Sequence, residues 1–284
     1  MSALAFDDVS ITLGRRRILS GVSLAIEPGE FVGIMGPNGA GKTTMLRAAL
    51  GLIPVSGGRI SVLGAAPRRG NAAIGYVPQS RRVAAQIGIT GTELLLSAHG
   101  GERWGLPLPS SDDRAAVAAA LARVGATDLA RRPVAELSGG ERQRLFVAQA
   151  LVGAPKLLLL DEPLISLDPA HQRAIVELVR AVSRELNAAV LFSAHEINPL
   201  LRAVDKVLYL GGGQAAIGTV DEVINEAVLS DLYRTEVRVI RAEGRIFVIA
   251  EDGSLDGHEH DHDHDHDHDH AGHDHDHAGH DHAH

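Results

Sequence analysis

The 284-residue sequence contains no cysteine and few aromatic residues, with one tryptophan among them. The absence of cysteine excludes disulfide bonds, thiolate zinc sites and iron–sulfur clusters. No apolar run approaches the ~18 residues that a membrane-crossing helix needs. The first ten residues hold two aspartates and no basic residue, so no secretory signal is predicted. We therefore expect a protein that works in the cytosol.

Basic residues are absent from the last part of the chain, residues 251–284. This stretch holds twelve of the 36 acidic residues and 13 of the 16 histidines, and all 27 basic residues precede it. Residues 1–250 are therefore close to neutral, which is too small a positive surplus to indicate a nucleic-acid partner. Residues 251–284 contain almost nothing that would form a core, and we expect a disordered tail rich in histidine and aspartate.

Short apolar runs alternate with helical patterns in the second half of the chain. Such alternation is typical of an α/β fold with a parallel sheet covered by helices. We expect strands over 3–9, 22–26, 30–35, 157–160, 188–193 and 206–210, helices over 90–99, 112–124, 169–186 and 196–203, and a terminal hairpin over 236–241 and 245–249.

A glycine-rich segment follows the predicted strand 30–35 and precedes a helical pattern. It fits the template G-x-x-x-x-G-K-[ST], whose backbone N–H groups surround the phosphates of a nucleotide. The lysine would reach the β- and γ-phosphates, and the first threonine hydroxyl would ligate Mg²⁺. The segment reads Gly36, Pro37, Asn38, Gly39, Ala40, Gly41, Lys42, Thr43 and Thr44.

Two carboxylates, Asp161 and Glu162, follow the apolar run Leu157–Leu160. A buried strand that ends in acidic residues places them at the carboxyl edge of the sheet, where the phosphate loop also opens. We assign Asp161 to Mg²⁺ and Glu162 to the general base that activates the attacking water.

The segment LSGGERQR, residues 137–144, predicts a second helix start. Ser138 and Glu141 have capping-box spacing, and Gly139 and Gly140 would expose backbone N–H groups in the first turn. A helix start of this kind suits an anion. Because the chain has one lysine-bearing loop, a second anion site indicates a second nucleotide or a partner subunit.

In these motifs the chain resembles the ATP-binding subunit of ABC transporters over about residues 3–230. The family's fold has a P-loop parallel-sheet core, an N-terminal antiparallel β-subdomain and an α-helical subdomain, here about 84–152. The resemblance implies one ATP-binding domain over 1–250 and a head-to-tail homodimer. Two ATP molecules would lie between the subunits, each between one subunit's phosphate loop and the other's Ser138, Gly139 and Gly140.

The resemblance also gives roles to residues that composition and spacing do not single out. Gln79, in YVPQ, would sense Mg²⁺ and water, and His195, in SAHE, would contact the γ-phosphate and Glu162. Asp168 would communicate across the dimer, although it also suits a helix cap before Pro169. The family usually stacks an aromatic residue on adenine, and the matching position here is Leu13.

The tail supplies imidazoles and carboxylates, which are ligands for Zn²⁺ and similar ions. A solvated tail with incidental metal affinity is the alternative. The candidate zinc ligands are His258, His260, His262, His264, His266, His268, His270, His273, His275, His277, His280, His282 and His284.

The order of residues from Ser193 onward is similar to the ATPases of zinc and manganese importers, and the tail favours zinc. This similarity implies integral membrane permease subunits, an extracytoplasmic metal-binding protein, and a peripheral location on the cytoplasmic face of the inner membrane. Three alternatives stay open at this point. They are an importer of iron–siderophore or of nickel and cobalt, a soluble ABC ATPase outside transport, and a cytosolic metal store.

Overall fold

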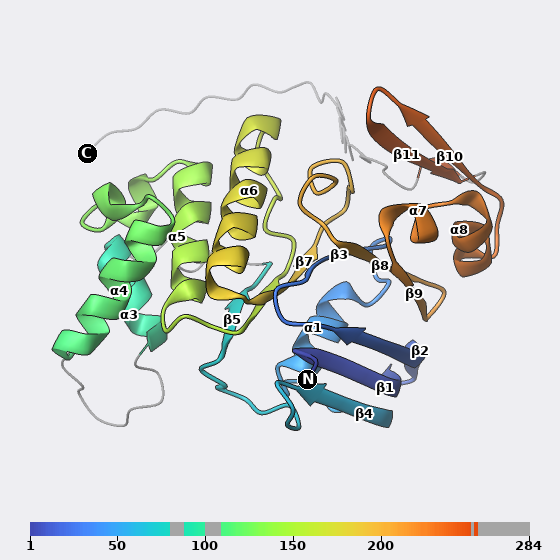
Figure 1. Cartoon of the computed structure of the whole chain (residues 1–284), viewed down its shortest axis with the longest axis horizontal. Coiled ribbons are helices and arrows are strands. Elements are labelled where there is room, and N and C mark those ends of the chain that lie inside the picture. Colours follow the sequence, from blue (N-terminus) through green and yellow to red (C-terminus); the bar gives the residue numbers. More distant parts are fainter. Residues whose placement is uncertain (80–87, 100–108, 251–252, 255–284) are drawn as a thin grey trace, which may run out of the picture.

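The computed structural model describes residues 1–79, 88–99, 109–250 and 253–254, and a six-stranded sheet forms its centre (Figure 1). The strand order is β5–β6–β7–β3–β8–β9; the first five strands run parallel and β9 pairs antiparallel with β8. The strands are β3 (Phe31–Met35), β5 (Ile74–Val77), β6 (Leu157–Leu160), β7 (Ala189–Ser193), β8 (Lys206–Gly211) and β9 (Gln214–Gly218).

The central sheet separates two hydrophobic cores, and side chains enter them alternately along each strand. In β6, Leu157 and Leu159 pack into one core while Leu158 and Leu160 pack into the other. All four residues of this strand are buried. Continuous apolar runs therefore form strands here because helices or a second sheet cover both faces, as parallel sheets require.

An antiparallel sheet and helix α1 (Lys42–Ala49) cover one face of the central sheet. The antiparallel sheet has the order β2–β1–β4, and Figure 1 shows it next to α1. Its side chains join those of α1 in one of the two cores. The strands are β1 (Leu4–Leu13), β2 (Arg16–Ile26) and β4 (Gly57–Val62).

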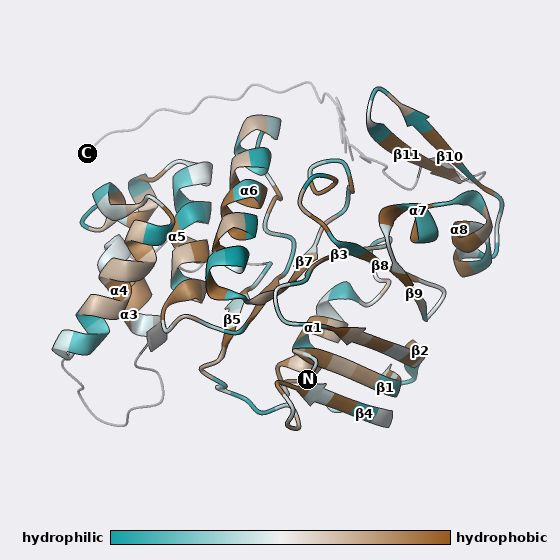
Figure 2. Ribbon diagram, in the orientation of Figure 1, coloured by the Kyte–Doolittle hydropathy of each residue, from teal (hydrophilic) through white to brown (hydrophobic). Residues whose placement is uncertain are grey.

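Helices cover the other face, and three of them begin at the polar residues that cap them. Ser110 and Ser138 each form a reciprocal capping box, and Asp168 caps α6 before Pro169. Figure 1 shows α3, α4 and α5 together at one side, with α6 between them and β7. The bounds are α3 (Gly91–His99), α4 (Ser111–Arg123), η1 (Thr127–Leu129), η2 (Val134–Glu136), α5 (Gly139–Leu151) and α6 (Pro169–Leu186). Figure 2 shows polar residues on the outward parts of these helices and hydrophobic residues along the strands.

The chain beyond β9 forms two short helices and a hairpin. The expected hairpin is confirmed: β10 and β11 pair from Val237↔Ala250 to Ala242↔Arg245. The side chain of Asn198 joins this hairpin to the central part by donating to Ile246 O and accepting from Ile246 N. The elements are α7 (Val220–Val223), α8 (Glu226–Tyr233), β10 (Val237–Ala242), β11 (Arg245–Ala250) and β12 (Gly253–Ser254).

The prediction of a helix over 196–203 is wrong, because this segment forms consecutive turns. Pro199 has no N–H to donate and restricts Asn198 to non-helical conformations. The hydrogen bonds from Leu200 N to Ile197 O and from Ala203 N to Leu200 O span three residues. The other expected strands and helices are present, with ends shifted by a few residues.

Two expectations concern residues outside the described ranges: part of the helical subdomain, including 100–108, and the tail histidines from His258 onward. None of the helices in the described ranges is both long and apolar enough to cross a membrane.

Candidate nucleotide-binding site

The glycine-rich segment forms a tight loop between β3 and α1, and its glycines are structurally required. Gly36 has φ 134°, and a Cβ there would lie 2.3 Å from Leu210 O. Gly41 caps α1 with φ 106°, and a Cβ there would lie 2.8 Å from a methyl group of Ile18. A side chain at either position would therefore displace the backbone. Because Gly41 has no side chain to cap α1, the first N–H groups of the helix stay available to an anion.

Lys42 is buried, and its ammonium contacts the loop and one carboxylate. Its Nζ donates to Gly36 O at 2.7 Å and lies 3.6 Å from Glu162 Oε1. Burial lowers the pKa of Lys42, although the nearby charge of Glu162 acts in the opposite direction. Lys42 Nζ also donates to Pro37 O at 3.4 Å. A buried cation held by two backbone carbonyls and one distant carboxylate is well placed to take a stronger anionic partner.

Asp161 lies at the end of β6 and is fully buried. Its Oδ1 accepts hydrogen bonds from Thr43 Oγ1 and Ser193 Oγ, both at 3.1 Å, whereas its Oδ2 has no partner among the described residues. Burial raises the pKa of Asp161, against the effect of these two hydrogen bonds. A buried carboxylate oxygen without a partner, beside a threonine hydroxyl, fits a hard cation that prefers oxygen ligands, such as Mg²⁺.

Glu162 follows in a left-handed backbone conformation, φ 49°, which residues other than glycine seldom adopt. A hydrogen bond from its N–H to Ser193 Oγ, 2.8 Å, holds the backbone there. Gln79 donates to Glu162 Oε2, and His195 Nε2 lies 3.0 Å from Glu162 Oε1. Burial alone would raise the pKa of Glu162, but His195 and Lys42 outweigh that effect and lower it. The carboxyl group is therefore ionised near neutral pH.

A cavity of about 730 Å³ opens beside these groups. It is lined by the start of the phosphate loop, by Glu162, by the segment after it, and by Ser193 to Glu196. Tyr209 and Tyr233 also line it, and their hydroxyl groups lie 2.9 Å apart. The cavity thus brings Gly36, Pro37, Asn38, Glu162 and His195 together, as the motif order predicts.

The second predicted anion site lies apart from the first. The helix start expected at Ser138 is confirmed by its capping box with Glu141, whose pKa is lowered to about 2 by the hydrogen bonds from Ser138. Figure 1 shows α5 separated from α1 by α6 and the central sheet. Nothing in the described part of the chain brings Ser138 to the phosphate loop.

His171 connects the second site to the start of α6. A Cβ on Gly140 would lie 2.3 Å from His171 Cδ2, so the imidazole packs directly on this glycine. His171 Nδ1 lies 2.5 Å from Asp168 Oδ2, and Asp168 Oδ1 accepts from the N–H groups of Ala170 and His171. The helix-cap interpretation of Asp168 is therefore confirmed, while its role across a dimer stays a prediction.

Leu13 is the last residue of β1 and is 42% exposed. It pairs with Arg16, whose Nη2 would lie 3.9 Å from a Cβ placed on Gly39. The side chain of Arg16 therefore reaches the phosphate loop, while the contact of Leu13 with adenine stays a prediction.

Replacing Leu13 with tyrosine should tighten ATP binding. Base–aromatic stacking contributes roughly 1–3 kcal/mol in single-strand nucleic-acid sites, which we take as an upper range. ATP titration by calorimetry measures the change. Thr12→Tyr is the control, because neighbouring strand residues point to opposite faces. An unchanged dissociation constant for Leu13→Tyr would place adenine elsewhere, for example against Arg15 or Arg16.

Ser193 was missed by the sequence analysis. It holds the carboxylate of Asp161 and the backbone of Glu162 from the neighbouring strand β7. Its position at the end of an apolar strand, next to the strand that carries the two acids, is the signal that could have identified it.

Comparison with known proteins agrees with this geometry. Residues 19–165 match the family model described as ABC transporter. The chain is 39% identical over 225 residues to the zinc import ATP-binding protein ZnuC of Cereibacter sphaeroides, covering 79% of this chain and 86% of that protein. It is 37% identical over 219 residues to ZnuC of Roseobacter denitrificans, covering 77% and 79% of the two chains.

Solved structures give the same result. One chain of an ABC transporter in an inward-facing conformation has a TM-score of 0.74 and 25% identity, covering 87% of this chain and 96% of that one. The cbiO1 protein of Clostridium perfringens, part of the ABC transporter complex cbiONQ, has a TM-score of 0.69 and 26% identity, covering 81% and 93%. The chain belongs to the ABC transporter family. The predicted fold class and the resemblance to the ATP-binding subunits of this family are thus confirmed.

Proposed function

We propose that this protein is the ATP-hydrolysing subunit of a zinc importer. The observation that carries the proposal is the pair of relatives named for zinc import, each aligned over more than three quarters of this chain. The phosphate loop and the two carboxylates supply the site that such an enzyme needs. A soluble ATPase outside transport and a metal store find no comparable support. Manganese, iron–siderophore or nickel and cobalt remain the other cargoes to test.

ATP would bind with its phosphates on the loop from Gly36 to Thr44. Lys42 would exchange its contact with Glu162 for the β- and γ-phosphates, a stronger charge-assisted pairing. Thr43 and Asp161, with Gln79 nearby, would hold Mg²⁺, which neutralises phosphate charge in the transition state. The partnerless Oδ2 of Asp161 supports this assignment.

Glu162 would accept the proton of the water that attacks the γ-phosphate. Its lowered pKa keeps the carboxylate able to accept a proton at neutral pH. Gln79 and His195 already contact it and would orient it and the water. The release of Lys42 toward the phosphates would leave Oε1 of Glu162 with His195 as its one contact, so this oxygen would keep a lone pair for the proton of the water.

The second site would act in a homodimer. Ser138, Gly139 and Gly140 of one subunit would close over the γ-phosphate bound to the other, with Asp168 beside them. The separation of α5 from α1 supports this arrangement, because one chain does not bring the two anion sites together (Figure 1). His171, which packs on Gly140 and bonds Asp168, would hold the two segments in a fixed relation.

We also propose the division into an ATP-binding domain over 1–250, with a helical subdomain about 84–152, and a tail over 251–284. The ATPase would bind permease subunits at the cytoplasmic face of the inner membrane, with an extracytoplasmic zinc-binding protein in the same system.

The histidines of the tail would bind Zn²⁺. Among the residues that the structure describes, no group of three or more acidic or histidine side chains is arranged to hold a metal ion. Metal sites are therefore expected from the tail, where imidazole and carboxylate alternate.

Deleting residues 258–284 should remove several Zn²⁺ sites. Each site needs two or more neutral imidazoles, so Zn²⁺ binding by the full chain should weaken as the pH falls through ~6.5 toward ~5. Calorimetric titration of both forms with Zn²⁺ and Mn²⁺ measures this. An equal number of zinc ions in the two forms would mean that the tail is inert.

The cargo is tested by the metal content of cells with and without this protein, grown under limiting zinc. Loss of the protein should lower cellular zinc, while manganese, iron, nickel and cobalt stay unchanged. An unchanged zinc content together with loss of another metal would reassign the cargo. No change in any metal would favour a role outside transport.

A further inference from the structure

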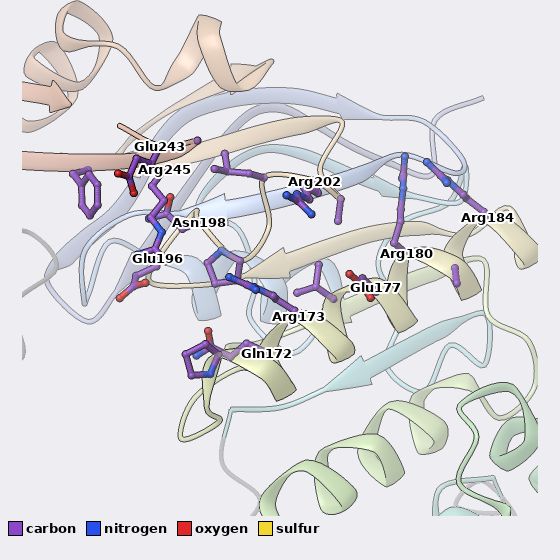
Figure 3. A pocket seen from close by; sticks show the side chains of 18 residues that line it. Gln172, Arg173, Glu177, Arg180, Arg184, Glu196, Asn198, Arg202, Glu243 and Arg245 are labelled. Atoms are coloured by element: carbon purple, nitrogen blue, oxygen red, sulfur yellow. The ribbon is translucent and has the colours of Figure 1, made fainter. Parts of the chain in front are cut away.

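A second cavity, of about 590 Å³, lies between α6, the loop over residues 196–203 and the turn of the β10–β11 hairpin (Figure 3). Arginines from all three elements line it, and Figure 3 shows them along its length. We call this cavity the arginine groove. Its arginines are Arg173, Arg180, Arg184, Arg202 and Arg245.

Four of these arginines form no hydrogen bond or ion pair with another described residue, although the charge of Arg184 helps to lower the pKa of Asp205. Arg180 is committed to Asp205, with an ion pair of 2.6 Å. The other four are exposed and make no side-chain hydrogen bond or ion pair with any residue in the described ranges. The lining also contains Glu177, Glu196 and Glu243, so the arginines outnumber the acids. Guanidinium groups bind carboxylates in a bidentate manner, which makes the groove suited to an acidic segment.

The chain itself leads an acidic segment toward this groove. Strand β12 pairs antiparallel with β11, with Ser254 opposite Ile249 and Gly253 opposite Ala250. The backbone at Ser254 therefore runs back along β11 toward the hairpin turn. Phe247, which lines the groove, lies two residues beyond Ile249 in that direction, a distance of roughly 7 Å.

The sequence after Ser254 has the pattern that an extended occupant requires. From His258 to His270, histidines and acidic residues alternate without interruption. In an extended chain, successive side chains point to opposite sides, so the carboxylates form one row and the imidazoles the other. The groove follows α6 from Pro169 to Arg184, about 22 Å of helix, which about seven extended residues would cover.

We propose that residues 255–284 dock in the arginine groove of the same chain, through the row of carboxylates and with the imidazoles facing outward. Docking needs neither zinc nor ATP, and so goes beyond the proposed function. One consequence rests on the proposed metal binding: the docked tail would present a row of histidines to incoming ions. The groove shares Pro169, Gln172, Glu196 and Pro199 with the nucleotide cavity, so the tail would lie next to the segment that carries His195.

The absence of cysteine allows a direct test on the full chain. Glu185→Cys on α6 and His264→Cys in the tail carry two spin labels, and electron–electron dipolar spectroscopy measures the distance between them with a metal chelator present. We expect a short, narrow distance population at low salt. It should be lost at ~1 M salt, where the screening length falls to ~3 Å.

Two matched pairs of variants separate charge from other effects. Changing the acidic residues of 255–284 to their amides should abolish the short distance, whereas changing the histidines there to glutamine should preserve it. Changing the four groove arginines other than Arg180 to glutamine should also abolish the short distance. The same change at four exposed arginines elsewhere should have no effect; these are Arg59, Arg68, Arg114 and Arg131.

The four arginine substitutions could unfold the groove, but the amide substitutions lie only in 255–284 and leave residues 1–250 unchanged. The tail variant therefore tests docking even if the groove variant does not fold. A broad distance distribution for the wild-type chain at low salt would overturn the proposal. So would a short distance that survives in the amide tail. Mixing singly labelled chains tests the remaining occupant, because a short distance between different chains would mean docking on a second copy instead. If docking holds while the tail deletion leaves zinc binding unchanged, only the metal consequence fails.

Discussion

Glu162→Gln should leave ATP binding intact and nearly abolish ATP turnover. The amide keeps the size of the side chain and can still face Gln79 and His195, but it cannot accept the proton of the attacking water. General-base assistance is typically worth ~10²–10⁴-fold in rate. With hydrolysis blocked, ATP should accumulate in a stable dimer, which size-exclusion chromatography with ATP would detect.

Glu236→Gln is the control for this change, because Glu236 is an exposed carboxylate next to Arg238 on the terminal hairpin. It should hydrolyse ATP at the wild-type rate. Turnover near wild type for Glu162→Gln, with only monomer in the presence of ATP, would show that Glu162 is not the base.

Lys42→Ala and Ser138→Arg should fail in different ways. Lys42 supplies the side-chain charge of the phosphate loop, and a hydrogen bond to a charged group is worth ~1.5–3 kcal/mol. Its loss should weaken ATP binding by roughly 10–150-fold. Ser138→Arg should leave binding to one subunit unchanged, because α5 lies apart from α1, but the bulky cation should block closure onto the partner.

Nucleotide titration and ATP-dependent dimerisation together distinguish the two variants. Ser110→Arg is a matched control for Ser138→Arg, because Ser110 caps α4 with the same capping box and both changes lose a cap worth ~1 kcal/mol. Ser110→Arg should still form the dimer. Equal loss of ATP binding in Lys42→Ala and Ser138→Arg would contradict the arrangement with ATP between two subunits.

Four strands of the central sheet could be predicted because their signal is local, whereas β5 and β9 were not predicted. The runs at 157–160 and 188–193 are short, continuous and apolar, and both faces of these strands are buried. The helix starts at Ser138 and Asp168 could also be predicted, since a helix cap depends only on a polar side chain and the backbone N–H groups of the next turn. The failure at 196–203 arose where apolar spacing suggested a helix but Pro199 prevents it.

Long-range contacts could not be predicted in the same way. Asn198 bonds Ile246, which lies 48 residues away, and nothing in either segment indicates the other. Ser193, at the end of β7, donates to Asp161 at the end of the neighbouring strand β6, and a serine at a strand end has no periodic pattern. The motif residues themselves were found because their spacing matches a known template. The structure then places Gly36, Glu162 and His195 around one cavity and Ser138 apart from it.

Uptake of radioactive zinc by cells that lack the endogenous protein tests the central claim most directly. Cells that express the wild-type chain should take up zinc faster than cells that express Glu162→Gln, with equal amounts of the two proteins at the membrane. The account predicts that Glu162→Gln reduces uptake to the level of cells with neither protein. Zinc uptake by Glu162→Gln cells at the wild-type rate would contradict the claim that ATP hydrolysis at this site drives import.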